Sequence, residues 1–335
     1  SGCIATHLIG MKPLPKASAV RQPQKKPPDP GLGQALVWLR MTRPAFLWLT
    51  VVACVLGTAT AAACGCGLDL PLALGATALA VLAHAAGNVL NDLHDARNGA
   101  DAANQRGIFP FTGGSRLIQT GVATERQTAE LAFALVLFLV PAGLLLAVKA
   151  GGGVLLLGLA GLVLAWAYSA PPLRLMSRGL GELTVALVWF LVVVGADYVQ
   201  RRHFFPIPAW VALGFALLVA ALLLINGFPD AEADAQVGKR TLVVRLGPVK
   251  ASALYAVLAL GAHLWLVAGV WLLGAAGAAG TGVADVATML LTTKPWLWAG
   301  VFAAIRETAS APVVVAITRG VRPGPVPWPM GRRPR

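Results

Sequence analysis

Eight stretches of mostly apolar residues recur along this chain of 335 residues, and they limit the folds that it can adopt. A bilayer core needs an α-helix of about 20 apolar residues to cross it, so each stretch predicts a membrane-spanning helix. Their approximate ranges are 45–64, 71–90, 128–148, 151–168, 183–199, 209–225, 252–274 and 284–305. A further apolar segment, 311–317, is too short to cross alone and is a candidate stub of a ninth helix. The sequence therefore predicts an all-α, polytopic transmembrane helix bundle of about eight to nine helices.

The composition supports a membrane protein. Only 12% of the residues are charged and 57% are hydrophobic, whereas a soluble domain has about 25% charged residues. The net charge of +13 comes from 27 Lys and Arg against 14 Asp and Glu. No basic surface interleaved with aromatic residues accompanies this charge, so we expect no nucleic-acid partner.

The basic residues gather in alternate loops, as the positive-inside rule describes. They lie in the N-terminal tail and in the loops 91–127, 169–182 and 227–251, whereas the run Arg201-Arg202-His203 on the other side is an exception. These loops predict a multi-pass protein of the inner (cytoplasmic) membrane, with the basic side in the cytoplasm. We expect a disordered basic tail over 1–40, a membrane domain over 41–305 and an atypical C-terminal segment over 306–335.

Acidic and amide residues cluster at the ends of two apolar stretches. Carboxylates beside hydrocarbon are costly and indicate a functional site. If the two helices continue through the clusters, residues four apart share a helix face. The first face then carries Asn91 and Asp95, with Asp92 and Asp101 close by, and the second carries Asn226, Asp230 and Asp234.

Carboxylates at this spacing repel each other unless a cation lies between them. Mg²⁺ binds a few carboxylates together with phosphate oxygens and water. The two faces therefore predict a site for Mg²⁺ and a diphosphate on the cytoplasmic side, with Asn91, Asp95, Asp230 and Asp234 as metal ligands. The alternative is that these residues are solvated helix caps or loop residues.

Basic residues follow both clusters, and positioned cations stabilise a leaving diphosphate. Lys239 and Arg240 follow the second cluster and Arg116 follows the first. The pair Gly113-Gly114 predicts a turn that presents backbone N–H groups to an anion. Anchoring of the basic loops at the membrane surface is the alternative for all three side chains.

The loop after the fourth apolar stretch begins Tyr168-Ser169-Ala170-Pro171-Pro172 and continues to Arg174. Tyr168 is a candidate for stabilising a carbocation, and Arg174 for binding a phosphate or carboxylate. An interfacial tyrosine and an anchoring arginine are the alternatives.

These motifs resemble the UbiA superfamily of intramembrane prenyltransferases over roughly residues 40–250. Asn91-Asp92-x-x-Asp95 is similar to the first aspartate-rich motif of that family. The segment from Asp230 through Asp234 to Gly238-Lys239-Arg240-Thr241 is similar to the second. Arg43-Pro44 and the segment 168–172 are also family-like. Residues beyond about 280 do not resemble the family well.

The resemblance implies a helical bundle around a central cavity that opens laterally to lipid. It implies Mg²⁺-dependent transfer of a polyprenyl group from its diphosphate to an aromatic acceptor, in the bilayer and without an obligate protein partner. The catalytic residues would be Asp92, Asp95, Asp101, Arg116, Tyr168 and Lys239. The diphosphate-binding residues would be Asn91, Arg116, Arg174, Asn226, Lys239 and Arg240.

Two features are more similar to the 1,4-dihydroxy-2-naphthoate polyprenyltransferases of menaquinone synthesis than to the 4-hydroxybenzoate branch. Gly99 stands where that branch has an Asp, with the acid following at Asp101, and the stretch 111–116 replaces a basic Arg-Pro stretch. The hypothesis is that the ring attacks the prenyl C1 and that loss of CO₂ and a proton restores aromaticity. The alternatives are 4-hydroxybenzoate, homogentisate, a haem or chlorophyll precursor as acceptor, an inactive family member, or a membrane transporter.

Overall fold

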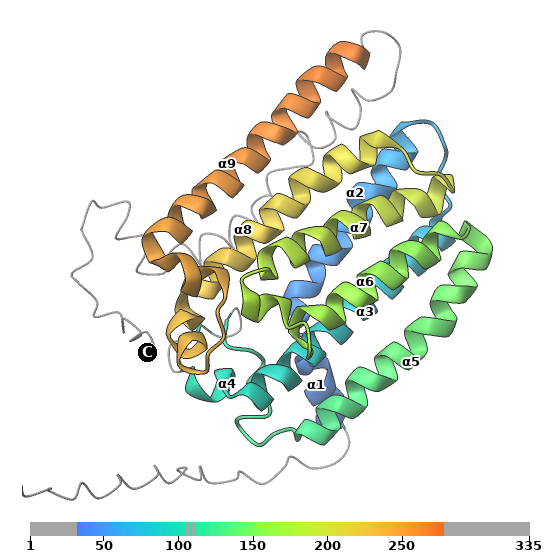
Figure 1. The fold of residues 1–335 in the computed structure, drawn as a ribbon. Helices are drawn as coiled ribbons and strands as arrows, with labels where there is room; N and C mark the ends of the chain where they lie inside the picture. The colour runs from blue at the N-terminus through green and yellow to red at the C-terminus, as the bar shows by residue number, and fades with distance from the viewer. Residues whose placement is uncertain (1–31, 105–106, 109–111, 278–335) are drawn as a thin grey trace, which may run out of the picture.

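The computed structural model describes residues 32–104, 107–108 and 112–277, and these residues form helices and loops without a strand. Figure 1 shows the long helices side by side, with α9 at one edge of the bundle and α5 at the other. The helices are α1 Leu32–Met41, α2 Pro44–Ala63, α3 Leu70–Asn98, α4 Ala100–Ala103, α5 Glu125–Ala150, α6 Gly153–Ser169, α7 Gly181–Arg201, α8 Pro206–Gln236 and α9 Leu242–Gly277, with the 3₁₀-helix η1 at Leu175–Arg178. The all-α prediction is confirmed.

Seven of these helices coincide with the first seven predicted spans. Six are long and apolar enough to cross a membrane, namely α2, α3, α5, α7, α8 and α9. Helix α6 is a shorter apolar helix of 17 residues. The predicted span 284–305 and the segment 311–317 lie outside the described residues. The chain is therefore a multi-pass membrane protein.

Helices α3 and α8 continue through the two acidic clusters. They have 29 and 31 residues, so at 1.5 Å per residue each is about 45 Å long. The hydrocarbon core of a bilayer is about 30 Å thick. The last turns of both helices therefore extend past the apolar stretch, and these turns carry the clustered carboxylates.

Small residues let the central helices approach closely, as is usual in a bilayer, where the hydrophobic effect does not hold helices together. Gly57 of α2 packs on α7 so tightly that a Cβ there would lie 2.1 Å from the carbonyl oxygen of Val193. Ala53, Val193 and Ala212 form the centre of the buried cluster where α2, α7 and α8 meet. Helix α9 joins α8 through stacked indoles of Trp210 and Trp265, each donating to the other's backbone carbonyl.

The end of the segment predicted as a disordered tail is helical. Residues 32–40 belong to α1, and residues 1–31 lie outside the described part of the chain. Val37 and Met41 are buried against Val89 of α3 and Leu117. This apolar contact holds a ten-residue helix that would be marginal in isolation.

Candidate active site

A cavity of about 630 Å³ lies inside the bundle between α2, α3, α5, α6, α7 and α8. Its walls are mostly apolar, with side chains such as Leu79, Leu162, Val188 and Leu222. Its polar end lies where α3 and α8 leave the apolar stretch. The polar side chains there are Arg43, Asn91, Asp95, Asp101, Asn104, Asn226, Asp230, Asp234 and Lys239.

The first predicted face is present on α3. Asn91 and Asp95 both line the cavity, and Asn91 Nδ2 donates a hydrogen bond of 3.1 Å to Asp95 Oδ2. The four-residue spacing thus puts the two side chains on one side of a continuous helix, as the sequence predicts.

The second predicted face is present on α8. Asn226, Asp230 and Asp234 all line the cavity. Asn226 Oδ1 is buried, and among the described residues it has no hydrogen-bond partner. A buried oxygen without a donor is costly, so this atom fits a site that is completed by a ligand.

Lys239 joins the two faces. Its Nζ lies 3.0 Å from Asp95 Oδ1 and 3.3 Å from Asp234 Oδ1, and all three side chains are buried. Burial lowers the pKa of Lys239, but the carboxylates of Asp95 and Asp234 outweigh burial and raise the pKa above its ordinary value. The ammonium therefore stays charged and neutralises part of the acidic cluster.

Arg43 is a site residue to which the sequence argument gave no role. It precedes α2, lines the cavity and pairs with the buried carboxylate of Asp92. Its guanidinium also donates to Asn91 Oδ1 at 3.4 Å. Asp92 itself does not line the cavity, and it also accepts the backbone N–H of Ser115 at 3.2 Å. Asp92 thus holds the guanidinium of Arg43 and the loop at Ser115 in place at the polar end of the cavity.

The Gly113-Gly114 turn does present an N–H group to an anion, and that anion is a carboxylate of the site. Gly113 N donates to Asp230 Oδ2 at 3.2 Å, and Asn104 Nδ2 donates to Asp230 Oδ1 at 2.6 Å. Both glycines have positive φ, a conformation that other L-residues adopt only at a cost. The turn therefore orients Asp230 from the side opposite α8.

Asp101 lies beneath the same turn. A Cβ on Gly114 would come 2.7 Å from Asp101 Oδ2, and that oxygen accepts a hydrogen bond of 3.2 Å from Gln119. Burial and the neighbouring carboxylates of Asp95 and Asp92 together raise the pKa of Asp101 to about 7, because they outweigh the positive charges of Arg43 and Lys239. Asp101 lines the cavity at its polar end.

Besides Asp92, the structure leaves three further predicted residues away from the cavity wall, namely Arg116, Arg174 and Arg240. Arg116 donates instead to the backbone carbonyls of Asp101, at 3.3 Å, and Asn104, at 2.9 Å, so it holds the loop after α4. Arg174 and Arg240 are exposed beside the site. Their diphosphate-binding roles stay predictions, whereas Tyr168 does line the cavity from the last turn of α6.

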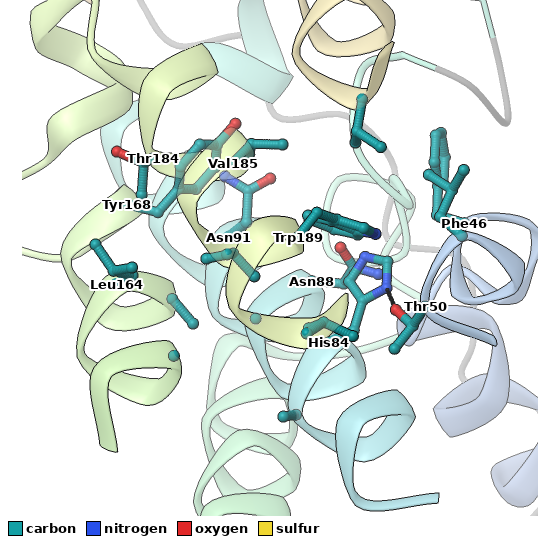
Figure 2. A pocket seen from close by; sticks show the side chains of 18 of the residues that line it. Phe46, Thr50, His84, Asn88, Asn91, Leu164, Tyr168, Thr184, Val185 and Trp189 are labelled. Carbon is teal, nitrogen blue, oxygen red and sulfur yellow. Dashed lines mark hydrogen bonds between the residues drawn. The ribbon is translucent and has the colours of Figure 1, made fainter. Parts of the chain in front are cut away.

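Deeper in the cavity lies a second polar group that the sequence argument missed. His84 of α3 shares a hydrogen bond of 2.8 Å with Thr50 of α2, and its ring meets the indole of Trp189 edge-on at 4.9 Å (Figure 2). The available signal was a lone histidine inside the apolar stretch 71–90, which is unusual at membrane depth.

The donor chemistry of the polar end fits Mg²⁺. In the described part of the chain, no three His, Cys, Asp or Glu side chains converge on one metal position. Mg²⁺ does not need such a cage, because it commonly binds one or two carboxylates together with phosphate oxygens and waters. Asp95, Asp230 and Asp234 supply carboxylate oxygens, and the unpartnered Asn226 Oδ1 supplies a neutral one.

Comparison with known proteins agrees with this arrangement. Residues 46–314 match the model of the UbiA prenyltransferase family. The 1,4-dihydroxy-2-naphthoate octaprenyltransferase of Escherichia coli (strain K12) is 33% identical over 243 residues, which cover 70% of this chain and 76% of that protein. UbiA prenyltransferase domain-containing protein 1 of Dictyostelium discoideum is 27% identical over 260 residues, 75% of each chain.

A solved structure has the same fold. It is a UbiA homolog from Archaeoglobus fulgidus bound to DMAPP and Mg²⁺, with a TM-score of 0.56 and 16% identity over 84% of this chain and 87% of that chain. The family match covers most of the sequence, and the helical bundle with its acidic cavity agrees with it. The chain therefore belongs to the UbiA prenyltransferase family and is a membrane enzyme of UbiA-type prenyl transfer.

Proposed function

We propose that this enzyme transfers a polyprenyl group from polyprenyl diphosphate to 1,4-dihydroxy-2-naphthoate, with Mg²⁺, and releases diphosphate and CO₂. The observation that carries the proposal is that one cavity joins an acidic, lysine-bridged end to a long apolar chamber. Such a cavity matches the two halves of a polyprenyl diphosphate, one highly charged and the other pure hydrocarbon.

The choice of acceptor is supported by relatives. The proteins of Escherichia coli and Bacillus subtilis, 33% and 28% identical, are both named 1,4-dihydroxy-2-naphthoate octaprenyltransferase. A relative from Synechocystis, 27% identical, is named 2-carboxy-1,4-naphthoquinone phytyltransferase. These names share a two-ring acceptor with a carboxyl group, which favours a naphthoate over a single-ring acceptor.

The metal is supported by the donor set described above and by the Archaeoglobus fulgidus homologue, which was solved with Mg²⁺ and either DMAPP or GPP. When bound, Mg²⁺ would neutralise diphosphate oxygens and so favour departure of the leaving group. Asn91, Asp95, Asn226, Asp230 and Asp234 would hold it.

The chain's own residues act on the rest of the reaction. Lys239 and Arg43 would hold the diphosphate by charge, and Lys239 remains close as negative charge grows on the leaving oxygen. Tyr168, on the cavity wall, would lie beside the allylic carbon as it becomes positive. The apolar wall holds the hydrocarbon chain and excludes water that would otherwise capture that carbon.

The acceptor ring then attacks the prenyl C1 while the bond from C1 to the diphosphate oxygen breaks. The diphosphate takes the electron pair of that bond. The carboxyl group leaves the ring as CO₂ and a proton, which restores aromaticity.

We place this chemistry at the cytoplasmic face of the inner membrane, because the basic loops surround the polar end of the cavity.

An acceptor-competition assay tests the proposal. The protein in detergent receives a polyprenyl diphosphate, Mg²⁺ and equal amounts of 1,4-dihydroxy-2-naphthoate and 4-hydroxybenzoate, and the products are identified by mass. We expect a decarboxylated prenyl-naphthol product that disappears with EDTA and returns with Mg²⁺. Transfer to 4-hydroxybenzoate alone contradicts the proposed acceptor, and transfer that survives EDTA contradicts the role of the metal.

A further inference from the structure

The polar group formed by Thr50, His84 and Trp189 is unexpected where it lies. All three side chains line the cavity, and each comes from a different helix: α2, α3 and α7. The neighbouring wall is apolar, with Leu79, Ala83 and Val188 among its members. A hydrocarbon chain offers no hydrogen bond, so a wall that only contacts a prenyl tail has no use for this group.

Trp189 has an unused donor. The side chain is 7% exposed, and its buried Nε1 has no hydrogen-bond partner among the described residues. An indole N–H only donates, so the missing partner must be an acceptor atom such as oxygen. Buried tryptophans usually find such a partner.

His84 is held in place with one nitrogen left over. Its Nδ1 contacts Thr50 Oγ1 at 2.8 Å, and its ring is perpendicular to the indole of Trp189. Among the described residues, Nε2 makes no hydrogen bond. Figure 2 shows the imidazole, the indole and Thr50 gathered around one part of the cavity, with Asn88 and Asn91 farther along α3.

The distance from the diphosphate end fits an acceptor ring. His84, Asn88, Asn91 and Asp95 line the same cavity from one face of α3. Asn91 is seven positions after His84, so at 1.5 Å per residue His84 lies about 10 Å deeper along the helix. With the diphosphate at Asn91, the prenyl C1 lies deeper in the cavity, and the ring carbon that it meets lies deeper still. The oxygens beside that ring carbon therefore reach toward His84.

We propose that Trp189 and His84, the latter oriented by Thr50, form the subsite that binds an oxygen substituent on the ring of the aromatic acceptor. Trp189 Nε1 donates to that oxygen. His84 Nε2 makes a second hydrogen bond, in which it either donates to the same oxygen or accepts the proton of that hydroxyl group. This inference rests on the proposed prenyl transfer and adds to it the residues that select an oxygen-bearing aromatic ring.

The test separates the two substrates by their KM values. Trp189→Phe keeps an aromatic ring and removes the N–H group. We expect the KM for the naphthoate acceptor to rise about tenfold, as for the loss of one hydrogen bond, with the KM for the prenyl diphosphate within twofold of wild type. Trp48→Phe is the matched control, because Trp48 is exposed and does not line the cavity. An unchanged acceptor KM in Trp189→Phe, or an equal rise in both KM values, overturns the subsite.

A second pair of variants keeps the test decisive if Trp189→Phe folds poorly. His84→Gln retains a hydrogen-bonding group and His84→Leu does not, so we expect His84→Gln to keep the acceptor KM at least threefold lower than His84→Leu. Equal values for the two variants contradict the subsite. Wild-type protein is assayed first: no transfer to any aromatic acceptor contradicts the proposed function, whereas wild-type transfer with unaffected variants contradicts the subsite alone.

Discussion

At the scale of single residues, the polar end of the cavity is organised by buried charges that compensate each other. The ammonium of Lys239 spans Asp95 on α3 and Asp234 on α8. The guanidinium of Arg43 forms an ion pair with Asp92. Removing one member of a buried ion pair leaves an uncompensated charge. The free energy lost in this way is larger than the net free energy that the intact pair contributes to stability. Each of these residues therefore shapes both the local fold and the charge at the polar end of the cavity.

Lys239→Met should lower kcat/KM for prenyl transfer about 100-fold, because the variant loses the cation that the proposed mechanism positions at the leaving group. Steady-state kinetics with varied prenyl diphosphate measures the effect. Lys250→Met is the control, since Lys250 is exposed at the start of the long part of α9. A kcat/KM within twofold of wild type for Lys239→Met would rule out the role given to Lys239.

Gly114→Ala should destabilise the protein more than Gly65→Ala does. Both glycines have positive φ, a conformation that costs another L-residue about 1–2 kcal/mol. A Cβ at position 114 would also press on the carboxylate of Asp101, whereas nothing lies within 4 Å of one at position 65. Thermal unfolding in detergent measures both variants. Equal midpoints for the two variants would show that the Asp101 contact does not matter.

At the scale of elements, the site exists because α3 and α8 are longer than the membrane needs. Their apolar turns line the cavity and their last turns carry the clustered carboxylates. Tight contacts at small residues, such as Gly57 of α2 against Val193 of α7, hold the central helices of the bundle together. The position of the site is therefore set by helix length and by close helix packing.

Gly57→Ala should lower the unfolding midpoint in detergent by several degrees, because the added methyl group has no room between α2 and α7. Gly75→Ala on α3 is the matched control, since nothing lies within 4 Å of a Cβ there. We expect the control to unfold at or slightly above the wild-type temperature. A Gly57→Ala midpoint equal to that of Gly75→Ala would contradict the packing described here.

Much of the fold was predictable from local patterns. The apolar stretches predicted eight spans, and the seven that fall within the described residues are helices. The four-residue spacing predicted two shared faces on the condition that α3 and α8 continue through their clusters, and both helices do so. The role of Arg43 was not predictable, because its partner Asp92 lies 49 residues away and only packing brings the two together. Arg116, Arg174 and Arg240 show the converse problem. An arginine near a membrane surface has the same local signature whether it binds a ligand, anchors a loop or bonds a carbonyl.

At the scale of the whole molecule, charge is asymmetric between the two ends of the bundle. The basic loops flank the site, whereas the far end carries the run Arg201-Arg202-His203. Arg201 is not a free charge, because it forms a buried ion pair of 2.9 Å with Asp197 and donates to the carbonyl oxygen of Thr60. This pairing reduces the apparent exception to the positive-inside rule and favours a site that faces the cytoplasm.

Labelling of cysteines from one side of the membrane tests that orientation. Cys66 is exposed in the connection between α2 and α3, at the end of both helices opposite the site, and Cys54 is buried. In a variant carrying Cys3→Ser and Cys64→Ser, an impermeant maleimide should label Cys66 in intact spheroplasts. Adding Cys66→Ser and Arg240→Cys should confine labelling to permeabilised membranes. The opposite pattern would reverse the orientation.

In the proposed mechanism, carboxylates of the polar end bind the metal–diphosphate, and prenyl transfer depends on this binding. The most direct test is the rate of Mg²⁺-dependent transfer in Asp230→Asn, which keeps the shape of a side chain that lines the cavity and removes its charge. Glu130→Gln makes the same chemical change at an exposed position on α5. We predict that Asp230→Asn loses at least about 100-fold in rate while Glu130→Gln matches wild type. A rate for Asp230→Asn within twofold of wild type would mean that the Asp230 carboxylate is not needed to bind the metal–diphosphate.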